Sequence, residues 1–346
     1  MARRRRKSGR NKGSGFGSFL LMLFLFALLA GGAAGWLVLT PYGPETKTLV
    51  TVAPGSSAMA IGRKLEAAGI VRSQYAFDLV RWIMRRRLQA GVYQFDHPAP
   101  LTEVYSRIAR GDVVTISVTI PEGANIFDIA TRVEQAGLCT RKDFTAAAVS
   151  QVGLIADLDP TATSLEGYLF PDTYKIPPTL TAVQMVGVMV RRFRAVAGQL
   201  GLGENVHRVV TIASLVERET AVDADRPLVA SVFENRLRKH IALGTDPAVI
   251  YGLELEGKWR GTIYASDLKR DTPYNTYLHA GLPPGPVANP GIPSLRAAMN
   301  PPPTSYLYFV AAGTNAQGHS LFAETLNEHN RNVAEYRHAR KKAGAR

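Results

Sequence analysis

The sequence predicts an α+β protein with a single N-terminal transmembrane helix, on three observations. A long uncharged apolar segment lies near the N-terminus, a pattern of strand, turn and helix occurs twice, and helical patterns outnumber strand-like segments in the rest of the chain. Runs of helices with a few strands are typical of α+β domains. With 346 residues, 46% of them hydrophobic, the chain is long enough for two or three domains with their own cores.

The apolar segment, residues 19–39, contains 21 residues without a charge, which is long enough to cross a bilayer as a helix. Arginines and lysines between positions 3 and 12 precede it, and the first acidic residue is Glu45. This asymmetry predicts a cytoplasmic N-terminus and an extracytoplasmic (periplasmic) body, held at the plasma (inner) membrane by one span. The small residues of "AGGAAG" also fit a cleaved signal peptide, but the apolar run continues through Trp36 to Leu39 and favours an anchor.

Charge outside the N-terminal arm is nearly balanced, with 34 basic and 28 acidic residues from position 45 onward. The "RRRRK" stretch alone would fit a nucleic-acid or nuclear-import patch, but the apolar segment that follows it argues against both. We therefore expect no nucleic-acid partner.

Motifs for metal, phosphate or serine-nucleophile chemistry are missing from the sequence. It holds no HExxH motif, no G-x-S-x-G elbow and no phosphate-binding glycine loop, and its seven histidines are scattered. We expect no metal and no cofactor. The one cysteine, Cys139, excludes an internal disulfide, and we interpret it as a small buried apolar residue.

An internal repeat relates residues 50–70 to residues 118–138, at an offset of 68. Each copy predicts a strand, a tight turn and a helix that ends at Gly69 or Gly137, and a second short helix follows each. In the first copy, "AGVYQFD" alternates like a returning strand. The resulting strand–helix–helix–strand pattern resembles the LysM peptidoglycan-binding domain, although a structural spacer that binds nothing fits it equally well.

The main domain begins at the second copy. An aromatic and acidic stretch, 165–177, predicts a loop at Pro171–Asp172, and helical patterns follow over 182–200, 206–221 and 225–240. The proline-, glycine- and tyrosine-rich region 245–303 predicts binding loops, before a strand, "SYLYFVAAG", and a basic C-terminal helix. The expected organisation is a basic cytoplasmic arm (1–18), a transmembrane helix (19–39), a linker (40–47), a LysM-like module (48–115), a catalytic domain (116–335) and a basic tail (336–346).

Two carboxylates lie two residues apart in "IASLVERETA", residues 212–221. Residues at that spacing do not share a helix face. Val209, Ile212, Val216 and Glu219 form one stripe, spaced 3, 4 and 3, so we expect Glu219 to point inward and Glu217 toward solvent. Burial raises the pKa of a carboxyl group, and a retained proton is what a general acid needs.

Other interpretations of these carboxylates stay open. Glu219 could instead form an ion pair in the core with Arg236 or Arg191. Asp246, in "GTDPAVIYGL", is a second candidate carboxylate, but it could equally cap the helix that begins near Pro247.

A set of ordered motifs resembles the endolytic murein transglycosylases, the YceG-like (MltG) family. These motifs are "LEGYLFPDTY", "IASLVERETA", "VASVFENRLR", "LGTDPAVIYGL", "YNTYLHAGLPPGPVANPG" and "YLYFVAAG". The resemblance implies a lyase that cuts peptidoglycan between N-acetylmuramic acid and N-acetylglucosamine without water. The family's catalytic glutamate falls on Glu219, followed by Thr220. The C6 hydroxyl of the muramic acid would be the nucleophile, giving a 1,6-anhydro end, and Glu219 would act first as acid and then as base.

The resemblance also implies a polar and aromatic groove for the glycan. Aromatic faces stack on sugar rings, while amides and carboxylates bind hydroxyl and N-acetyl groups. The candidates for lining it are Tyr168, Phe170, Asp172, Asn235, Asp246, Tyr251, Asn275 and Tyr277. A membrane-anchored enzyme of this kind would cleave nascent strands and limit their elongation, which suggests peptidoglycan synthases as partners.

Two other functions compete with this one. A non-catalytic, membrane-anchored peptidoglycan-binding scaffold would need the LysM-like module but no catalytic carboxyl group. A muramidase-type hydrolase would use two carboxylates, with Glu219 as acid and Asp246 or Glu217 as base.

Overall fold

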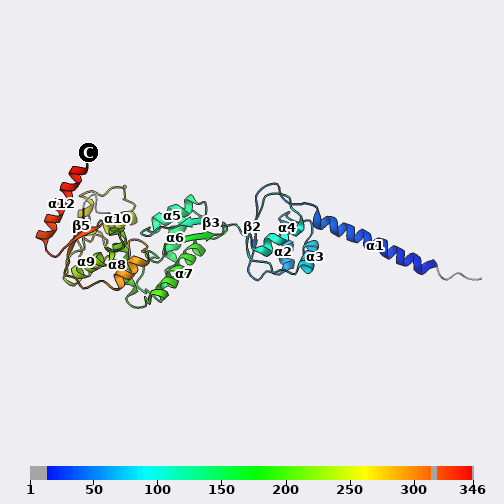
Figure 1. Ribbon diagram of the computed structural model, residues 1–346, viewed down its shortest axis with the longest axis horizontal. Coiled ribbons are helices and arrows are strands. Elements are labelled where there is room, and N and C mark those ends of the chain that lie inside the picture. The colour runs from blue at the N-terminus through cyan, green and yellow to red at the C-terminus, as the bar shows by residue number, and fades with distance from the viewer. Residues whose placement is uncertain (1–13, 313–317, 345–346) are drawn as a thin grey trace, which may run out of the picture. The chain divides into compact units, whose positions relative to one another are not determined.

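The computed structural model describes residues 14–312 and 318–344, in two compact units, Met1–Thr115 and Ile116–Arg346 (Figure 1). The basic residues of the expected cytoplasmic arm, between positions 3 and 12, lie outside the described residues. The chain is a mixture of helices and short strands, so the predicted α+β class is confirmed at this level.

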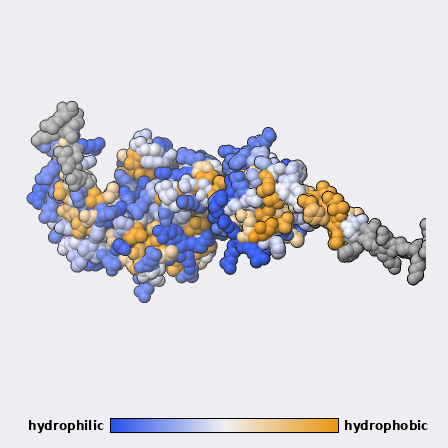
Figure 2. Space-filling model, turned by 45° about the vertical axis from the view of Figure 1, so that its right-hand side comes forward, coloured by the Kyte–Doolittle hydropathy of each residue, from blue (hydrophilic) through white to orange (hydrophobic). Residues whose placement is uncertain are grey.

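Helix α1 (Ser14–Leu39) carries the apolar segment, visible as an orange band in Figure 2. Within the described part of the chain, Gly17–Leu39 is the one helix long and apolar enough to cross a membrane. The C-terminal end of α1 packs on the rest of the first unit, where Leu37 and Val38 contact the hydrophobic core. The Arg72 guanidinium lies 4.4 Å from the centre of the Trp36 ring, which fixes this end further.

The first unit has the predicted order of strand, helix, helix and strand. It consists of β1 (Thr48–Val52), α2 (Ala58–Ala67), α3 (Gln74–Met84), β2 (Gly91–Phe95) and α4 (Leu101–Arg110). Strands β1 and β2 pair antiparallel, with Val50 opposite Tyr93. Ser57 and Ser73 cap the two helices through their side chains, and Leu65, Phe77 and Tyr105 are fully buried. The likeness to a LysM domain stays a prediction.

The second unit begins with the second copy of the repeat. It forms β3 (Ile116–Thr119), α5 (Ile126–Gln135), α6 (Arg141–Ser150), the short 3-10 helix η1 (Val152–Ile155) and β4 (Thr173–Ile176). Strands β3 and β4 pair antiparallel, as β1 and β2 do. The turn glycines of the two copies, Gly55 and Gly123, both have φ of 77°, a conformation that glycine adopts without strain.

The remainder of the second unit surrounds one central helix, α8 (Val206–Glu219). Every residue from Val210 to Val216 is buried, and α8 packs against α9, α10 and α11. Strands β5 and β6 form a hairpin that contacts α9 and α12. The elements around α8 are α7 (Ala182–Leu200), α9 (Arg226–Arg238), α10 (Asp246–Leu255), η2 (Asp267–Lys269), α11 (Ile292–Met299), β5 (Tyr308–Ala311), β6 (Ser320–Ala323) and α12 (Leu326–Gly344).

Candidate active site

Glu219 is the last residue of α8 and lines a cavity of about 330 Å³. Helix α9 contributes Arg236 to the cavity, and the segment that leads into α10 contributes Thr245 and Asp246. The other lining residues are Arg218, Leu243, Gly244, Pro247, Tyr277, Phe309 and His329. The cavity therefore collects side chains from segments that are far apart in the sequence.

The Glu219 carboxyl group has no hydrogen-bond or ion-pair partner among the described residues. Loss of hydration, and then the negative charge of Asp246, raise its pKa to about 7, while Arg236 and Arg218 act in the opposite direction. The position at the carboxyl end of α8, where the helix dipole is negative, also favours the neutral form. Glu219 can thus both donate and accept a proton near neutral pH.

Asp246 faces Tyr277 across the cavity. The Tyr277 hydroxyl donates to Asp246 Oδ1 at 2.7 Å, and burial together with this bond raises the pKa of Tyr277, so the phenol keeps its proton. Asp246 is the first residue of α10, but Thr245 holds the N-cap position and makes no side-chain capping bond. The Asp246 side chain is therefore directed to Tyr277 and not to a cap.

Arg236 is held by the backbone. Its guanidinium donates to the carbonyls of Leu307 at 2.6 Å and Leu243 at 2.8 Å, and it lies 5.1 Å from the centre of the Tyr308 ring. Burial lowers the pKa of Arg236. In the described residues, Glu219 forms no ion pair with Arg236 or Arg191, so the alternative core pair is not formed, although the charge of Arg236 still favours the ionised form of Glu219.

The side chain of Glu217 does not face solvent, which contradicts the expectation from the sequence. Its side chain is 4% exposed, and its Oε1 lies 2.8 Å from Arg226 Nη2. The other oxygen, Oε2, accepts the Gly291 N–H at 2.9 Å. The helical stripe could not separate the two glutamates, because α8 is buried on all sides over most of its length.

Only two of the eight expected groove residues, Asp246 and Tyr277, share the cavity with Glu219. Three others precede β4, a strand that follows directly after the loop expected at Pro171–Asp172 and that the sequence pattern did not indicate. The Tyr168 hydroxyl donates to Asp159 at 2.5 Å inside the core, Phe170 is buried, and Asp172 pairs with Arg192 at 2.7 Å. They serve the second copy of the repeat and do not line this cavity.

The remaining three expected groove residues are also structural. Asn235 donates to the carbonyls of Thr304 and Tyr306, each at 2.9 Å, and Asn275 donates to those of Leu268 and Arg270. Tyr251 is buried and packs edge-on against Tyr274, with 5.1 Å between ring centres.

Several cavity residues were not among the expected ones. Arg218, Phe309 and His329 reach the cavity from the end of α8, from β5 and from α12. Burial, and then the charge of Arg236, lower the pKa of His329, and its ring stacks on Tyr308. Arg218 and Phe309 lie within the quoted motifs "IASLVERETA" and "YLYFVAAG", but the motifs do not show which of their residues reach Glu219, since only the folded chain brings these positions together.

The described residues contain no group of three or more His, Cys, Asp or Glu side chains that could hold a metal ion. Cys139 is partly buried against the core of the second unit. Burial raises the pKa of its thiol, which favours an unreactive side chain.

The fold and the site define a class: an α+β protein with one N-terminal apolar helix and a proton-retaining glutamate in a cavity of its larger unit. The model of the YceG-like family matches residues 50–335. The chain belongs to the YceG-like family.

Relatives and a solved structure cover most of the chain. It is 33% identical to the endolytic murein transglycosylase of Bacillus subtilis (strain 168), over 89% of this chain and 91% of the relative. It is 32% identical to the endolytic murein transglycosylase of Streptococcus pneumoniae (strain R6), over 91% of this chain but only 64% of that longer protein. A crystal structure of a YceG-like protein from Listeria monocytogenes, 31% identical, superimposes with a TM-score of 0.53 over 83% of this chain and 99% of the other.

Proposed function

We propose that this protein is a membrane-anchored endolytic murein transglycosylase in which Glu219 is the general acid and base. The names of its relatives support the reaction. The observation that carries the residue assignment is the Glu219 carboxyl group, which lines a cavity, has no bonding partner among the residues that the structure describes, and has its pKa raised to about 7. A carboxyl group in that state serves proton transfer in both directions at neutral pH.

In the first step, protonated Glu219 donates its proton to the oxygen that links C1 of N-acetylmuramic acid to N-acetylglucosamine. The bond between C1 and this oxygen breaks, and positive charge develops at C1, as in other glycosidic cleavages. The N-acetylglucosamine side leaves with the proton as a free hydroxyl group.

In the second step, the C6 hydroxyl of the same muramic acid attacks C1 and closes a 1,6-anhydro ring. The Glu219 carboxylate accepts the hydroxyl proton and returns to its starting state. No water is consumed, so no second carboxylate is needed to activate one. The attack is intramolecular, which removes the entropic cost of bringing in a separate nucleophile.

The other polar groups of the cavity would support these steps electrostatically. Asp246 raises the pKa of Glu219, so the Glu219 carboxyl group carries its proton at neutral pH. Arg236 and Arg218 favour the ionised form that exists between the two steps. Tyr277, hydrogen-bonded to Asp246 and 41% exposed, offers an aromatic face to a sugar ring.

The placement of the enzyme is part of the proposal. Helix α1 would anchor it in the plasma membrane with the N-terminus in the cytoplasm, because the basic residues precede the span. Residues 48–115 would form a LysM-like module, and residues 116–335 the catalytic domain. In this position the enzyme would cleave nascent strands, limit their elongation and work beside peptidoglycan synthases.

One observation favours a hydrolase as the alternative. Asp246 lies in the same cavity as Glu219, and a hydrolase needs a second carboxylate as base or nucleophile. Against it, Asp246 is already hydrogen-bonded to Tyr277. Glu217 has both oxygens occupied, so it is not free to activate water.

The chemistry of the product ends tests the proposal. Purified full-length protein in detergent would be incubated with long peptidoglycan strands, and the fragments would be analysed by mass spectrometry. Internal fragments with 1,6-anhydromuramic ends are expected. Reducing muramic acid ends would establish a hydrolase, and intact strands that are bound but not cut would establish a scaffold.

A further inference from the structure

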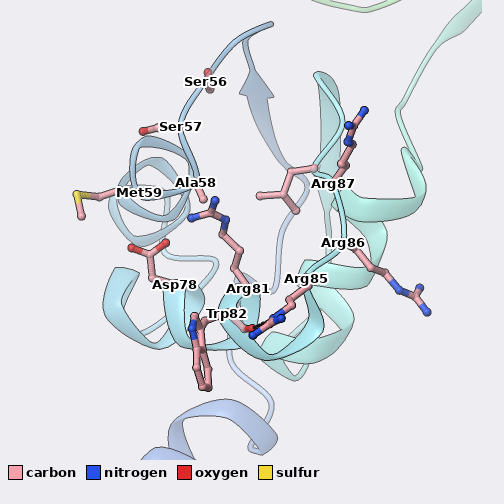
Figure 3. A pocket seen from close by; sticks show the side chains of 11 residues that line it. Ser56, Ser57, Ala58, Met59, Asp78, Arg81, Trp82, Arg85, Arg86 and Arg87 are labelled. Carbon is pink, nitrogen blue, oxygen red and sulfur yellow. Dashed lines mark hydrogen bonds between the residues drawn. The ribbon is translucent and has the colours of Figure 1, made fainter.

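A second site lies in the first unit, at a cavity of about 790 Å³ beside α3 (Figure 3). Four arginines surround it: Arg81 on α3, and Arg85, Arg86 and Arg87 on the turn after it. Figure 3 shows Arg81 extending over the cavity and Asp78 at its left side. Among the described residues that line the cavity, Asp78 is the one acidic residue.

These arginines take little part in the fold: among the described residues, the Arg85 guanidinium lies 5.9 Å from the centre of the Trp82 ring. Their guanidinium groups form no ion pair in the described residues, and the hydrogen bond from Arg85 Nε to the neighbouring Trp82 carbonyl, at 3.3 Å, is the only one that they make there. All four side chains are exposed. Exposed arginines this close together repel one another, an anion that binds them relieves that repulsion, and guanidinium groups match phosphate oxygens in geometry and charge.

An apolar stripe runs along α3 beside the arginines. Tyr75, Leu79, Trp82 and Ile83 follow helical spacing and are 74%, 40%, 68% and 63% exposed. The opposite face of α3 is already filled, since Ala76, Phe77 and Val80 belong to the core. The exposed stripe is therefore not part of the folding core, and basic helices with such a stripe lie in the interface of anionic membranes.

The anchor brings this helix to the membrane. The apolar segment Gly17–Leu39 has 23 residues, about 35 Å as a helix, which exceeds the roughly 30 Å of a hydrocarbon core. Helix α1 packs against α3 and α4, and Leu37 and Val38 at its end contact the core of the first unit. With α1 in the bilayer, α3 lies at the level of the lipid headgroups.

We propose that α3 and the arginine-rich turn 85–87 form a binding site for anionic phospholipids, which docks the first unit on the membrane surface. The arginines take the phosphate groups, while Trp82, Leu79 and Ile83 enter the region below the headgroups. This inference rests on α1 as the anchor and is independent of the reaction at Glu219.

Quenching of Trp82 fluorescence by brominated acyl chains tests the site. The chain has three tryptophans, so the full-length variant Trp36→Phe/Trp259→Phe carries Trp82 alone. It would be reconstituted into bilayers of brominated phosphatidylcholine, with and without phosphatidylglycerol. We expect strong quenching that requires phosphatidylglycerol and decreases with salt.

Charge-matched variants distinguish lipid binding by the arginines from simple attachment of the first unit through helix α1. In the same background, Arg81→Gln/Arg86→Gln/Arg87→Gln should weaken the docking equilibrium by roughly 100-fold, since each surface arginine contributes about five-fold. Arg331→Gln/Arg337→Gln/Arg340→Gln on α12 removes the same charge and should leave quenching unchanged. Murein cleavage by both variants would confirm that they are folded.

Three results would overturn the inference. Equal quenching in neutral and anionic bilayers, retained in the α3 variant, would mean that the tether alone holds Trp82 near the lipid. Absence of quenching in both bilayers would mean that the stripe stays in water. Protection of Trp82 from acrylamide by soluble glycan strands, without lipid quenching, would assign the site to glycan.

Discussion

Glu217 and Glu219 lie two residues apart on α8 and occupy opposite environments. The Glu217 side chain is buried with both oxygens engaged, one by Arg226 and one by the Gly291 N–H. As whole residues both are half-buried, but Glu219 lines a cavity and has no hydrogen-bond or ion-pair partner in the described part of the chain. The difference teaches that removal from water does not by itself identify a catalytic acid. The distinguishing feature is a carboxyl group that the fold leaves unpaired.

The two positions also differ in what their charges do for the fold. The Glu217–Arg226 pair compensates two buried charges, and Arg226 also pairs with the exposed Asp223, so loss of Glu217 removes the buried one of the two carboxylates that bind Arg226. Ionisation of Glu219 costs more in lost hydration and repulsion by Asp246 than Arg236 and Arg218 return, and its raised pKa reflects that net cost. One glutamate should therefore matter for stability and the other for activity.

The largest expected effect is on activity at Glu219. Glu219→Gln removes the transferable proton while it keeps the shape of the side chain, so the rate of anhydromuramic end formation should fall by roughly 10²–10⁴-fold, the usual contribution of a general acid or base. The measurement is release of such ends by mass spectrometry at equal concentrations of folded protein. A variant with wild-type activity would show that another group transfers the proton.

The second effect is on stability at Glu217. Glu217→Gln leaves the buried Arg226 guanidinium with only the exposed Asp223 as an ion-pair partner among the described residues, and it should lower the free energy of unfolding by about 1.5–3 kcal/mol, measured by denaturant unfolding of the second unit. Once corrected for the folded fraction, its activity should stay within a few-fold of wild type. Glu234→Gln, at a more exposed ion pair with Arg208, is the matched control and should cost below about 1 kcal/mol. Equal losses for the two variants would contradict the buried-pair account.

A smaller effect should appear when Glu219→Gln is unfolded as a function of pH. The folded pKa of Glu219, about 7, lies above the ordinary value of 4.5. The contribution of Glu219 to the stability of the wild type is therefore fully present below pH 4.5. That contribution is lost as the pH rises through 7. The variant lacks this loss, so it should be more stable than wild type by about 1–3 kcal/mol at alkaline pH and equal to it in acid. An unchanged difference across the pH range would mean that Glu219 titrates as it does in water.

The smallest effect is a shift of the pH profile in Asp246→Asn. The negative charge of Asp246 helps to raise the pKa of Glu219, so its removal should lower that pKa. Activity that needs protonated Glu219 then declines at a lower pH. The alkaline limb of the rate profile should therefore shift toward lower pH by less than about one pH unit. Asp271→Asn, on an exposed carboxyl group elsewhere, should leave the limb in place. A shift toward higher pH would contradict the assigned sign.

Sequence patterns predicted the elements well where their period was clear. The repeat, the helices near 182–200, 206–221 and 225–240, and the apolar N-terminal helix all correspond to elements of the structure. Strand β4 was missed, because a long connection that includes η1 separates it from α6. Tyr168, Phe170 and Asp172 were expected to line a groove, but they precede this half-buried strand.

The site was harder to predict for a physical reason. The motif containing Glu219 could be read from the chain, but the cavity depends on contacts between α8, α9, the start of α10, β5 and α12. Aromatic and amide residues in the loop region looked like sugar ligands, yet Asn235 and Asn275 bind backbone carbonyls that the loops would otherwise leave unpaired. Residue type alone does not distinguish these uses.

The most direct test of the central claim is the pKa of Glu219 itself. Full-length protein with ¹³C-labelled glutamate carboxyl groups would be titrated by NMR in detergent, and the Glu219 signal identified by its loss in Glu219→Gln. The account predicts a midpoint near pH 7. A midpoint near the ordinary value of 4.5 would mean that the fold does not hold a proton on Glu219 at neutral pH, and that it is not the general acid.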